Sequence, residues 1–371
     1  MIKKIVKIIA IIIAAVLVIV LGYIAYAFLS FSRIDDHLAL NVQNAAAGAP
    51  YGAEIYGEVE ETIPKGKELT AVSYNIGFGA YSDDFTFFMD GGKESWAFSK
   101  EAVYENISGA MDTVNAYDPD LALLQEVDID GTRSYHIDER SLVVPGIARS
   151  RSYDYIFAQN YNSPFLMYPI TQPHGANKAG ILTFSMAKIT SGERISLPIE
   201  TGFSKVLDLD RCYSKARIPV EGGAELVVYN LHLSAYTANA STAENQLRML
   251  VEDMQAEYDA GNYCIAGGDF NRDLLGNSPE IFHTAVLDDN WAAPVNMSLF
   301  TDDITLVVPF DENEPKASCR NPDKPYEPGD FVVTVDGFVK SANISVVKSD
   351  VIDVGFEYSD HNPVYVKFIL E

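Results

Sequence analysis

The segment Ala266-Gly267-Gly268-Asp269-Phe270-Asn271 combines residue types that could do chemistry at the end of a buried strand. Glycine lets the chain turn sharply and lets a ligand approach the backbone closely. We therefore expect Asp269 and Asn271, two residues apart, to lie on one side of the turn as acceptor and donor. Taken alone, the segment is equally typical of a plain strand-to-loop turn.

Other expected strand ends carry similar side chains. They are Asn75, Glu126, His232, Asp336 and the adjacent pair Asp360 and His361. Burying a charge without a partner is costly. One such residue is ordinary, and His232 alone could be a core histidine and Asp336 alone a turn residue. Six polar strand ends in equivalent places indicate a shared site.

The residue types favour a hard metal ion and phosphate chemistry. Oxygen donors such as Glu126 and the Asn75 amide match Mg²⁺ better than Zn²⁺, with Mn²⁺ as a possible substitute, since no Cys or closely spaced His pair offers softer ligands. Asp336 and His361 could form a carboxylate–imidazole pair that orients the ring. An ion, such a pair and a second acidic centre are what hydrolysis of a phosphate ester requires.

Two strand–helix–strand units are expected to position these groups. The first runs through a strand at 69–76, a helix at 99–117 with apolar residues at helical spacing, and a strand at 121–126. The second has a strand at 225–232, a helix begun by a Ser241–Glu244 capping box and closed by Gly261, and the strand before Asp269. Each unit ends in an acidic residue, which suggests an internal duplication whose strand ends meet at one edge.

Further strands are expected at 153–159, 179–184, 211–220, 331–338, 344–347 and 363–368. Residues 77–96 form a long loop, and the proline-rich segment 302–329 reads as an irregular surface loop. Many strands and few helices predict an α+β fold: a four-layer α/β sandwich of two mainly antiparallel sheets packed face to face, with helices outside.

The N-terminus predicts a membrane segment. Lys3, Lys4 and Lys7 precede an uncharged apolar run at 8–31, longer than the roughly 20 residues that cross a bilayer. Positive charge on the short side places the rest of the chain outside the cytoplasm. Ala25-Tyr26-Ala27 resembles a signal-peptidase site, so a secreted protein is the alternative. We divide the chain into a transmembrane signal-anchor (1–31), a stem (32–67) and one domain (68–371).

Composition adds limits. Of 371 residues, 48% are hydrophobic, which is ample for a large core. The net charge of −25 argues against a broad basic face for nucleic acid. Three cysteines are too few for a disulfide framework, and a Cys212–Cys319 bridge stays unassigned. Several cations could line a pocket and bind a second phosphate, although solvated surface charge is the simpler reading of each. They are Arg133, Arg140, Arg149, Arg151 and Lys178.

The chain resembles the endonuclease/exonuclease/phosphatase (deoxyribonuclease I-like) superfamily of metal-dependent phosphoesterases, which includes deoxyribonucleases, abasic-site endonucleases, sphingomyelinases and inositol polyphosphate phosphatases. The resemblance covers about residues 69–370 and rests on six short motifs in the family's order. These are Ser73-Tyr74-Asn75, Leu124-Gln125-Glu126-Val127, Asn230-Leu231-His232-Leu233, Gly268-Asp269-Phe270-Asn271, Val335-Asp336-Gly337-Phe338 and Ser359-Asp360-His361.

The resemblance implies a metal site with Glu126 as the main ligand, Asn75 beside it and Asp360 close to the ion. One Mg²⁺ is the default, because family members differ in metal count.

It also implies catalytic roles. Asp269 would orient or activate a water or protonate the leaving group, and Asn271 and His232 would bind phosphoryl oxygens. His361, held by Asp336, would act as base or phosphate ligand. Which histidine is acid and which is base stays open.

The predicted function is a membrane-tethered, extracytoplasmic, Mg²⁺-dependent phosphodiesterase acting on nucleic acid or a phospholipid headgroup, with no protein partner. The membrane segment and the loops at 77–96 and 302–329 depart from the family and leave the substrate open. One alternative is a phosphomonoesterase on inositol phosphates, recognised by release of inorganic phosphate. The other is a non-catalytic surface module, which a missing ligand or histidine would indicate, and none is missing.

Overall fold

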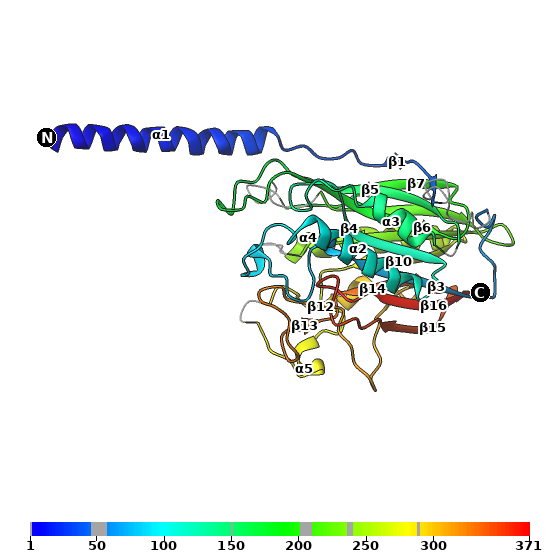
Figure 1. Ribbon diagram of the computed structural model, residues 1–371. Helices are drawn as coiled ribbons and strands as arrows, with labels where there is room; N and C mark the ends of the chain where they lie inside the picture. The colour runs from blue at the N-terminus through cyan, green and yellow to red at the C-terminus, as the bar shows by residue number, and fades with distance from the viewer. Residues whose placement is uncertain (1, 46–57, 150, 201–209, 236–239, 288–289) are drawn as a thin grey trace.

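Two seven-stranded sheets form the body of the computed structural model, which describes residues 2–45, 58–149, 151–200, 210–235, 240–287 and 290–371 (Figure 1). In order, the first sheet contains β1 (Leu38–Leu40), β7 (Ser191–Ser196), β8 (Cys212–Pro219), β9 (Glu225–His232), β10 (Tyr263–Asp269), β14 (Asp336–Ser341) and β11 (Ile304–Val307). The second contains β15 (Ile344–Val351), β16 (Val364–Leu370), β3 (Glu68–Asn75), β4 (Leu121–Gly131), β6 (Asn177–Ser185), β5 (Asp154–Asn162) and β2 (Gln43–Asn44). A short ribbon of β12 (Cys319–Arg320) and β13 (Val332–Val333) lies apart.

The two strand–helix–strand units occupy matching places in the two sheets. The pairs β3–β4 and β9–β10 are parallel, and every other pair of described strands is antiparallel. Helix α2 (Lys100–Asn115) joins the first pair and α4 (Ala240–Asp259) the second. When the edge strands β1 and β2 are left out, each sheet has its parallel pair at the centre. This pair is β3–β4 in one sheet and β9–β10 in the other, with two strands on each side. This arrangement agrees with the duplication suggested by the sequence.

Helix ends follow local chemistry. The Ser99 hydroxyl accepts a hydrogen bond from the Ala102 N–H at 3.1 Å and caps α2. Because α4 begins at Ala240, Ser241 lies inside the helix and not at its N-cap as predicted. Gly261 has φ +91° just after α4, as expected for a glycine that ends a helix.

Three apolar clusters give the four layers of the predicted sandwich. One, containing Leu123, Val228 and Phe368, lies between the sheets. Another packs α2 and α3 (Arg140–Ile147) on the second sheet, and a third packs α4 on the first. A short helix, α5 (Ser278–Phe282), lies near β13. The predicted fold class is confirmed.

Helix α1 (Ile2–Leu29) projects from this body (Figure 1). Its mean hydropathy is 3.2 over the most apolar window, none of which is buried against protein. By length and composition, it is a candidate membrane span, and a signal sequence near the N-terminus would have the same properties.

The predicted stem is partly integrated into the domain. Strands β1 and β2 pair with β7 and β5, at the edges of the two sheets. Arg33 donates to Asp210 at 2.8 Å, so the chain contacts the domain soon after α1 ends. Strands of two or three residues have too little periodicity to be recognised in a sequence. Residues 46–57 of the expected stem lie outside the described residues, and beyond them Glu60 and Ile63 form bridges with Ala187 and Val220.

The expectation of an irregular surface loop at 302–329 was wrong in two places. It contains β11 and β12, and Arg320 is fully buried. The guanidinium donates to the Ser82 and Phe85 carbonyls at 2.7 and 3.0 Å, which compensates for its burial.

An ion-pair cluster joins α4 to the first sheet, and its effect on the free energy of unfolding can be predicted. Glu257 bonds Lys215, Arg217 and Asn262. Burial acts to raise the pKa of Glu257, but these partners outweigh it and lower the pKa to about 2. The carboxylate thus stabilises the fold above its usual pKa of about 4.3, and the contribution is lost as the pH falls towards 2. Glu257→Gln should cost about 1–2 kcal/mol at pH 7, after allowing for solvent screening, and almost nothing near pH 2.

Urea unfolding of the Glu257→Gln variant across this pH range measures the effect. Exposed Glu252 on the same helix gives the matched control, Glu252→Gln, which should be neutral at every pH. A cost that does not vary with pH would contradict the ion-pair explanation.

Candidate active site

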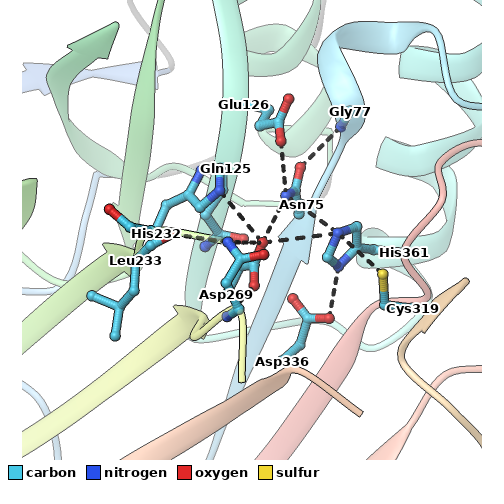
Figure 2. Close-up of polar contacts among 12 residues, drawn as sticks. Asn75, Gly77, Gln125, Glu126, His232, Leu233, Asp269, Cys319, Asp336 and His361 are labelled. Atoms are coloured by element: carbon cyan, nitrogen blue, oxygen red, sulfur yellow. Dashed lines mark hydrogen bonds and ion pairs between the residues drawn. The ribbon is translucent and has the colours of Figure 1, made fainter. Parts of the chain in front are cut away.

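The polar strand ends predicted from the sequence meet at one site, and Figure 2 shows six of them together: Asn75, Glu126, His232, Asp269, Asp336 and His361. Six of the eight predicted residues line a single cavity of about 320 Å³. They are Glu126, His232, Asp269, Asn271, Asp360 and His361. The other two do not line the cavity but bond residues that do: Asn75 bonds Asp269, and Asp336 bonds His361. The structure therefore brings the whole predicted set together.

Local backbone geometry aims the acidic groups. The β4–β6 register shifts between Leu124 and Val127, and Glu126 in this bulge has φ +55°. Bulges re-aim side chains, and left-handed backbone in a residue other than glycine is typical of functional sites. Gly268 has φ +149°, and a Cβ there would lie 2.0 Å from the Leu231 carbonyl oxygen. Only glycine allows β9 and β10 to approach this closely, which places Asp269 beside His232.

A buried amide pair joins the two sheets beneath the site. The Gln125 side chain of β4 donates to the Asn230 side chain of β9 at 2.8 Å. Asn230 in turn donates to the Leu182 carbonyl of β6 at 2.8 Å. Both residues are fully buried, so these bonds fix the relative positions of the strand ends. Sequence reasoning placed both residues in motifs but gave neither a role.

Asp269 is the centre of the polar network in Figure 2. Its Oδ2 atom lies 3.2 Å from Asn75 Nδ2, 3.4 Å from His232 Nε2 and 3.8 Å from His361 Nε2. Burial raises the pKa of Asp269 to about 7, against the lowering effect of His361. A carboxyl group with a pKa near 7 is suited to take up and release a proton at neutral pH.

Asn271 supports this carboxylate. Its backbone N–H donates to Asp269 Oδ1 at 2.8 Å. Its side-chain amide donates to the Leu233 carbonyl at 2.8 Å and to Asp269 Oδ2 at 3.2 Å. Acceptor and donor thus lie on one side of the turn as expected, and both amide hydrogens already serve these acceptors. Asn271 orients Asp269 here, and binding a phosphoryl oxygen would require it to give up one of these bonds.

The two histidines lie in opposite electrostatic surroundings. His361 Nδ1 lies 2.8 Å from Asp336 Oδ2. Burial acts to lower the pKa of His361, but Asp336 outweighs it and holds the pKa well above its usual value. Burial and nearby Arg211 instead lower the pKa of His232 far below the usual value. The raised pKa favours the imidazolium form of His361, and the lowered pKa favours the neutral imidazole form of His232.

Two carboxylates face the cavity beside the histidines. Asp360 keeps some exposure through the opening, yet the surrounding protein raises its pKa to about 6, and repulsion from Glu126 adds to this effect. The described residues contain no cluster of three or more His, Cys, Asp or Glu side chains that could hold a metal ion. Two carboxylates with mutual repulsion still fit Mg²⁺, which keeps several waters and uses one or two carboxylates together with substrate phosphate.

The Asn75 amide bonds several groups at the site. Its Oδ1 atom accepts from the Gly77 N–H at 3.1 Å, and its Nδ2 atom faces Glu126 Oε1 and Asp269 Oδ2, both at 3.2 Å. Asn75 is therefore a hydrogen-bond donor that holds the two carboxylates in place. Only the fold could reveal this, because the orientation of the amide is set by the turn at Gly77.

Three arginine side chains line the cavity, and the sequence analysis did not assign them to it. The expectation of solvated surface charge was wrong for Arg133, which is 7% exposed and lines the cavity. It bonds Asp128 at 2.7 Å, lies 3.9 Å from Glu126 and stacks on the Phe78 ring at 3.8 Å. Arg211 and Arg320 also line the cavity, and neither was predicted to do so. No local sequence signal marks them, because their partners come from distant segments.

The cysteines form no bridge. All three are buried and free. Cys319 Sγ lies 3.6 Å from His361 Nε2, while Cys212 packs with Ala158 and Ile181. The Cys212–Cys319 bridge left unassigned in the sequence is therefore absent. Burial raises the pKa of the Cys319 thiol to about 12, so it stays protonated next to the imidazolium.

Comparison with known proteins places this geometry in a family. The sequence model of the endonuclease/exonuclease/phosphatase family matches residues 72–361. The chain belongs to this family, whose members are phosphoesterases. No curated protein matches the sequence.

Solved structures share the fold at low sequence identity. An endonuclease/exonuclease/phosphatase from Beutenbergia cavernae has a TM-score of 0.55 and 18% identity, covering 82% of this chain and 72% of that one. A family protein from Bacteroides thetaiotaomicron has a TM-score of 0.51 and 16% identity, over 82% and 98%. The human Nocturnin catalytic domain, with bound sulfate, has a TM-score of 0.51 and 16% identity, over 83% and 95%. At such identities these likenesses show the fold alone.

Proposed function

We propose that this protein is a membrane-tethered, extracytoplasmic phosphodiesterase that requires Mg²⁺, with Mn²⁺ as a substitute. The observation that carries the proposal is the set of charges on one cavity. Glu126, Asp360 and Asp269 line the same cavity as His361, whose ring is held by Asp336 and whose raised pKa favours the cation. A phosphodiester brings the negative charge that such a cation stabilises, and a divalent cation would relieve the repulsion between the carboxylates.

Glu126 and Asp360 would hold the ion, with Asn75 keeping Glu126 in position through its 3.2 Å bond. When bound, Mg²⁺ would supply Lewis-acid stabilisation of charge on a phosphoryl oxygen.

The chain's own groups would do the rest. His361 would bind a phosphoryl oxygen as a cation, with Asp336 holding its ring. Asp269, with a pKa of about 7, would take a proton from the attacking water or supply one to the leaving oxygen. His232 Nε2 faces Asp269, and His232 Nδ1 has no hydrogen-bond partner within the described part of the chain. His232 also lines the cavity, where its imidazole would contact a phosphoryl oxygen of the substrate.

The proposed location is argued from α1. Lys3, Lys4 and Lys7 on its short side favour an anchor with the domain outside the cytoplasm. The net charge of −25 weakens the case for nucleic acid, and an anchor would bring the cavity near lipid. A phospholipid headgroup is therefore preferred to nucleic acid as the substrate.

The test is turnover of bis(p-nitrophenyl) phosphate by purified full-length protein in detergent. We expect Mg²⁺ to support hydrolysis, EDTA to reduce it at least about 10²-fold, and Mg²⁺ to restore it. Added Mg²⁺ should also raise the melting temperature, because an ion that binds the folded state stabilises it. Turnover that EDTA leaves unchanged would refute the metal assignment. If the protein shows no turnover and Mg²⁺ causes no thermal shift, a non-catalytic module is favoured.

A further inference from the structure

The loop between β5 and β6, residues 163–176, is here called the rim loop. Its base is a small hairpin in which Leu166 and Gly175 exchange backbone hydrogen bonds of 2.9 and 3.0 Å. Its tip exposes large apolar side chains in a row. They are Phe165 (42% exposed), Met167 (46%), Tyr168 (70%) and Ile170 (83%). Contiguous exposed apolar surface of this kind marks a binding face.

The rim loop contains no Asp, Glu, Lys or Arg, although the whole chain carries a net charge of −25. A surface free of carboxylates is one that an acidic protein can bring close to phosphate headgroups without local repulsion. The same loop also bounds the active site. His174 lines the cavity and packs on the Phe87 and Phe88 rings at 5.9 and 5.7 Å.

A second apolar segment continues this surface. The Phe88 ring lies 5.7 Å from the ring of Tyr168. Met89, the next residue, is 52% exposed and lines the cavity. The mouth of the cavity is therefore bordered by apolar side chains that reach the tip of the rim loop.

Contacts with α1 set the height of this surface relative to a bilayer. The Tyr23 hydroxyl donates to the Phe165 carbonyl at 3.2 Å and accepts from the Met167 N–H at 3.0 Å, and the Tyr26 hydroxyl accepts from the Phe165 N–H at 3.2 Å. Figure 1 shows the green loop after β5 on the side of the domain from which α1 projects.

The uncharged run begins at Ile8, so about 20 residues of helix reach to the level of Ala27. Tyr23 and Tyr26 then lie at the outer boundary of the hydrocarbon, where tyrosines gather. The rim loop, bonded to both, lies at the same depth, and its backbone groups at Phe165 and Met167 have partners there.

We propose that the rim-loop tip, residues 165–170, inserts into the outer surface of the bilayer that α1 crosses and holds the cavity mouth against lipid headgroups. The substrate class is then a phosphodiester in a membrane lipid. This inference rests on the proposed function for the substrate and on the anchor for the membrane, while insertion itself can be measured without any activity.

Insertion is tested on the full chain in phosphatidylcholine bilayers. Ile170→Cys is labelled with an environment-sensitive fluorophore, and the native cysteines are all buried, so the label goes to the introduced thiol. Val347→Cys, 51% exposed on the edge strand β15, is the matched control. We expect lipids carrying a doxyl quencher to quench the label at 170 and leave the label at 347 bright. A label at 170 that the lipid-borne quencher does not quench overturns the proposal. This holds even if its emission shows an apolar environment, because protein could provide that environment.

The substrate class is tested with the double variant Tyr168→Asp/Ile170→Asp and the control Val347→Asp. On sphingomyelin–phosphatidylcholine vesicles the double variant should lose at least about 10-fold of the wild-type rate, while hydrolysis of soluble bis(p-nitrophenyl) phosphate stays within about 2-fold. Equal loss on both substrates overturns the positioning role. Wild-type turnover of the soluble diester without any turnover of lipid overturns the substrate class. Absence of both activities refutes the proposed function, and fluorescence still decides insertion.

Discussion

Replacing Glu126 by Gln is expected to lower kcat/KM for a phosphodiester by about 10³-fold at fixed Mg²⁺. The change keeps the side chain's size but removes one of the two carboxylates that would hold the ion. Asn75 would then donate to an amide oxygen in place of a carboxylate. The measurement is Mg²⁺-dependent turnover together with the rise in melting temperature on adding Mg²⁺, and both should be lost.

Exposed Glu105 on α2 gives a matched control, Glu105→Gln, that should change neither quantity. A Glu126→Gln variant that keeps the Mg²⁺-dependent thermal shift would show that the ion binds elsewhere. Full activity in that variant would remove Glu126 from the mechanism.

Replacing His361 by Ala is expected to cost about 10³-fold in kcat because it removes the cation nearest Asp269. Asp336→Asn should cost less, about 10–100-fold, because the imidazole remains but loses its charged partner. The pKa of His361 is raised by Asp336, so in Asp336→Asn it should fall. If the imidazolium is the active form, the alkaline limb of the rate profile then moves to lower pH.

The exposed pair His136 and Asp130, 2.7 Å apart, provides the control for both variants. His136→Ala and Asp130→Asn should leave the pH profile unchanged. An Asp336→Asn variant whose alkaline limb moves to higher pH would contradict the assigned role of Asp336.

Strand ends could be predicted from the sequence because parallel strands deliver their carboxyl ends to one edge. Asp269 and Glu126 each follow an apolar run with a clear strand pattern, and both reached the cavity. Arg133 and Arg320 could not be placed this way, since Arg133 stacks on the distant Phe78 ring and Arg320 bonds carbonyls far along the chain. Sequence patterns report local periodicity, whereas the partner of a buried charge is a property of the fold.

The short edge strands were missed for a related reason. Strands β1 and β2 are held by pairing with β7 and β5, and their own residues carry no periodic signal.

The segment between α1 and its first contact with the domain is short, which limits how far the domain can move from the helix. Only Ser30, Phe31 and Ser32 separate the end of α1 from Arg33, which is already bound to Asp210. Three residues span about 10 Å at full extension. With α1 as its anchor, such an enzyme has no slack to sample the surrounding solution or an opposing cell. With a lipid of that bilayer as the proposed substrate, turnover would follow the mole fraction of this lipid in the enzyme's own leaflet. Diluting the lipid with inert neighbours would then slow turnover, while diluting the vesicles would not.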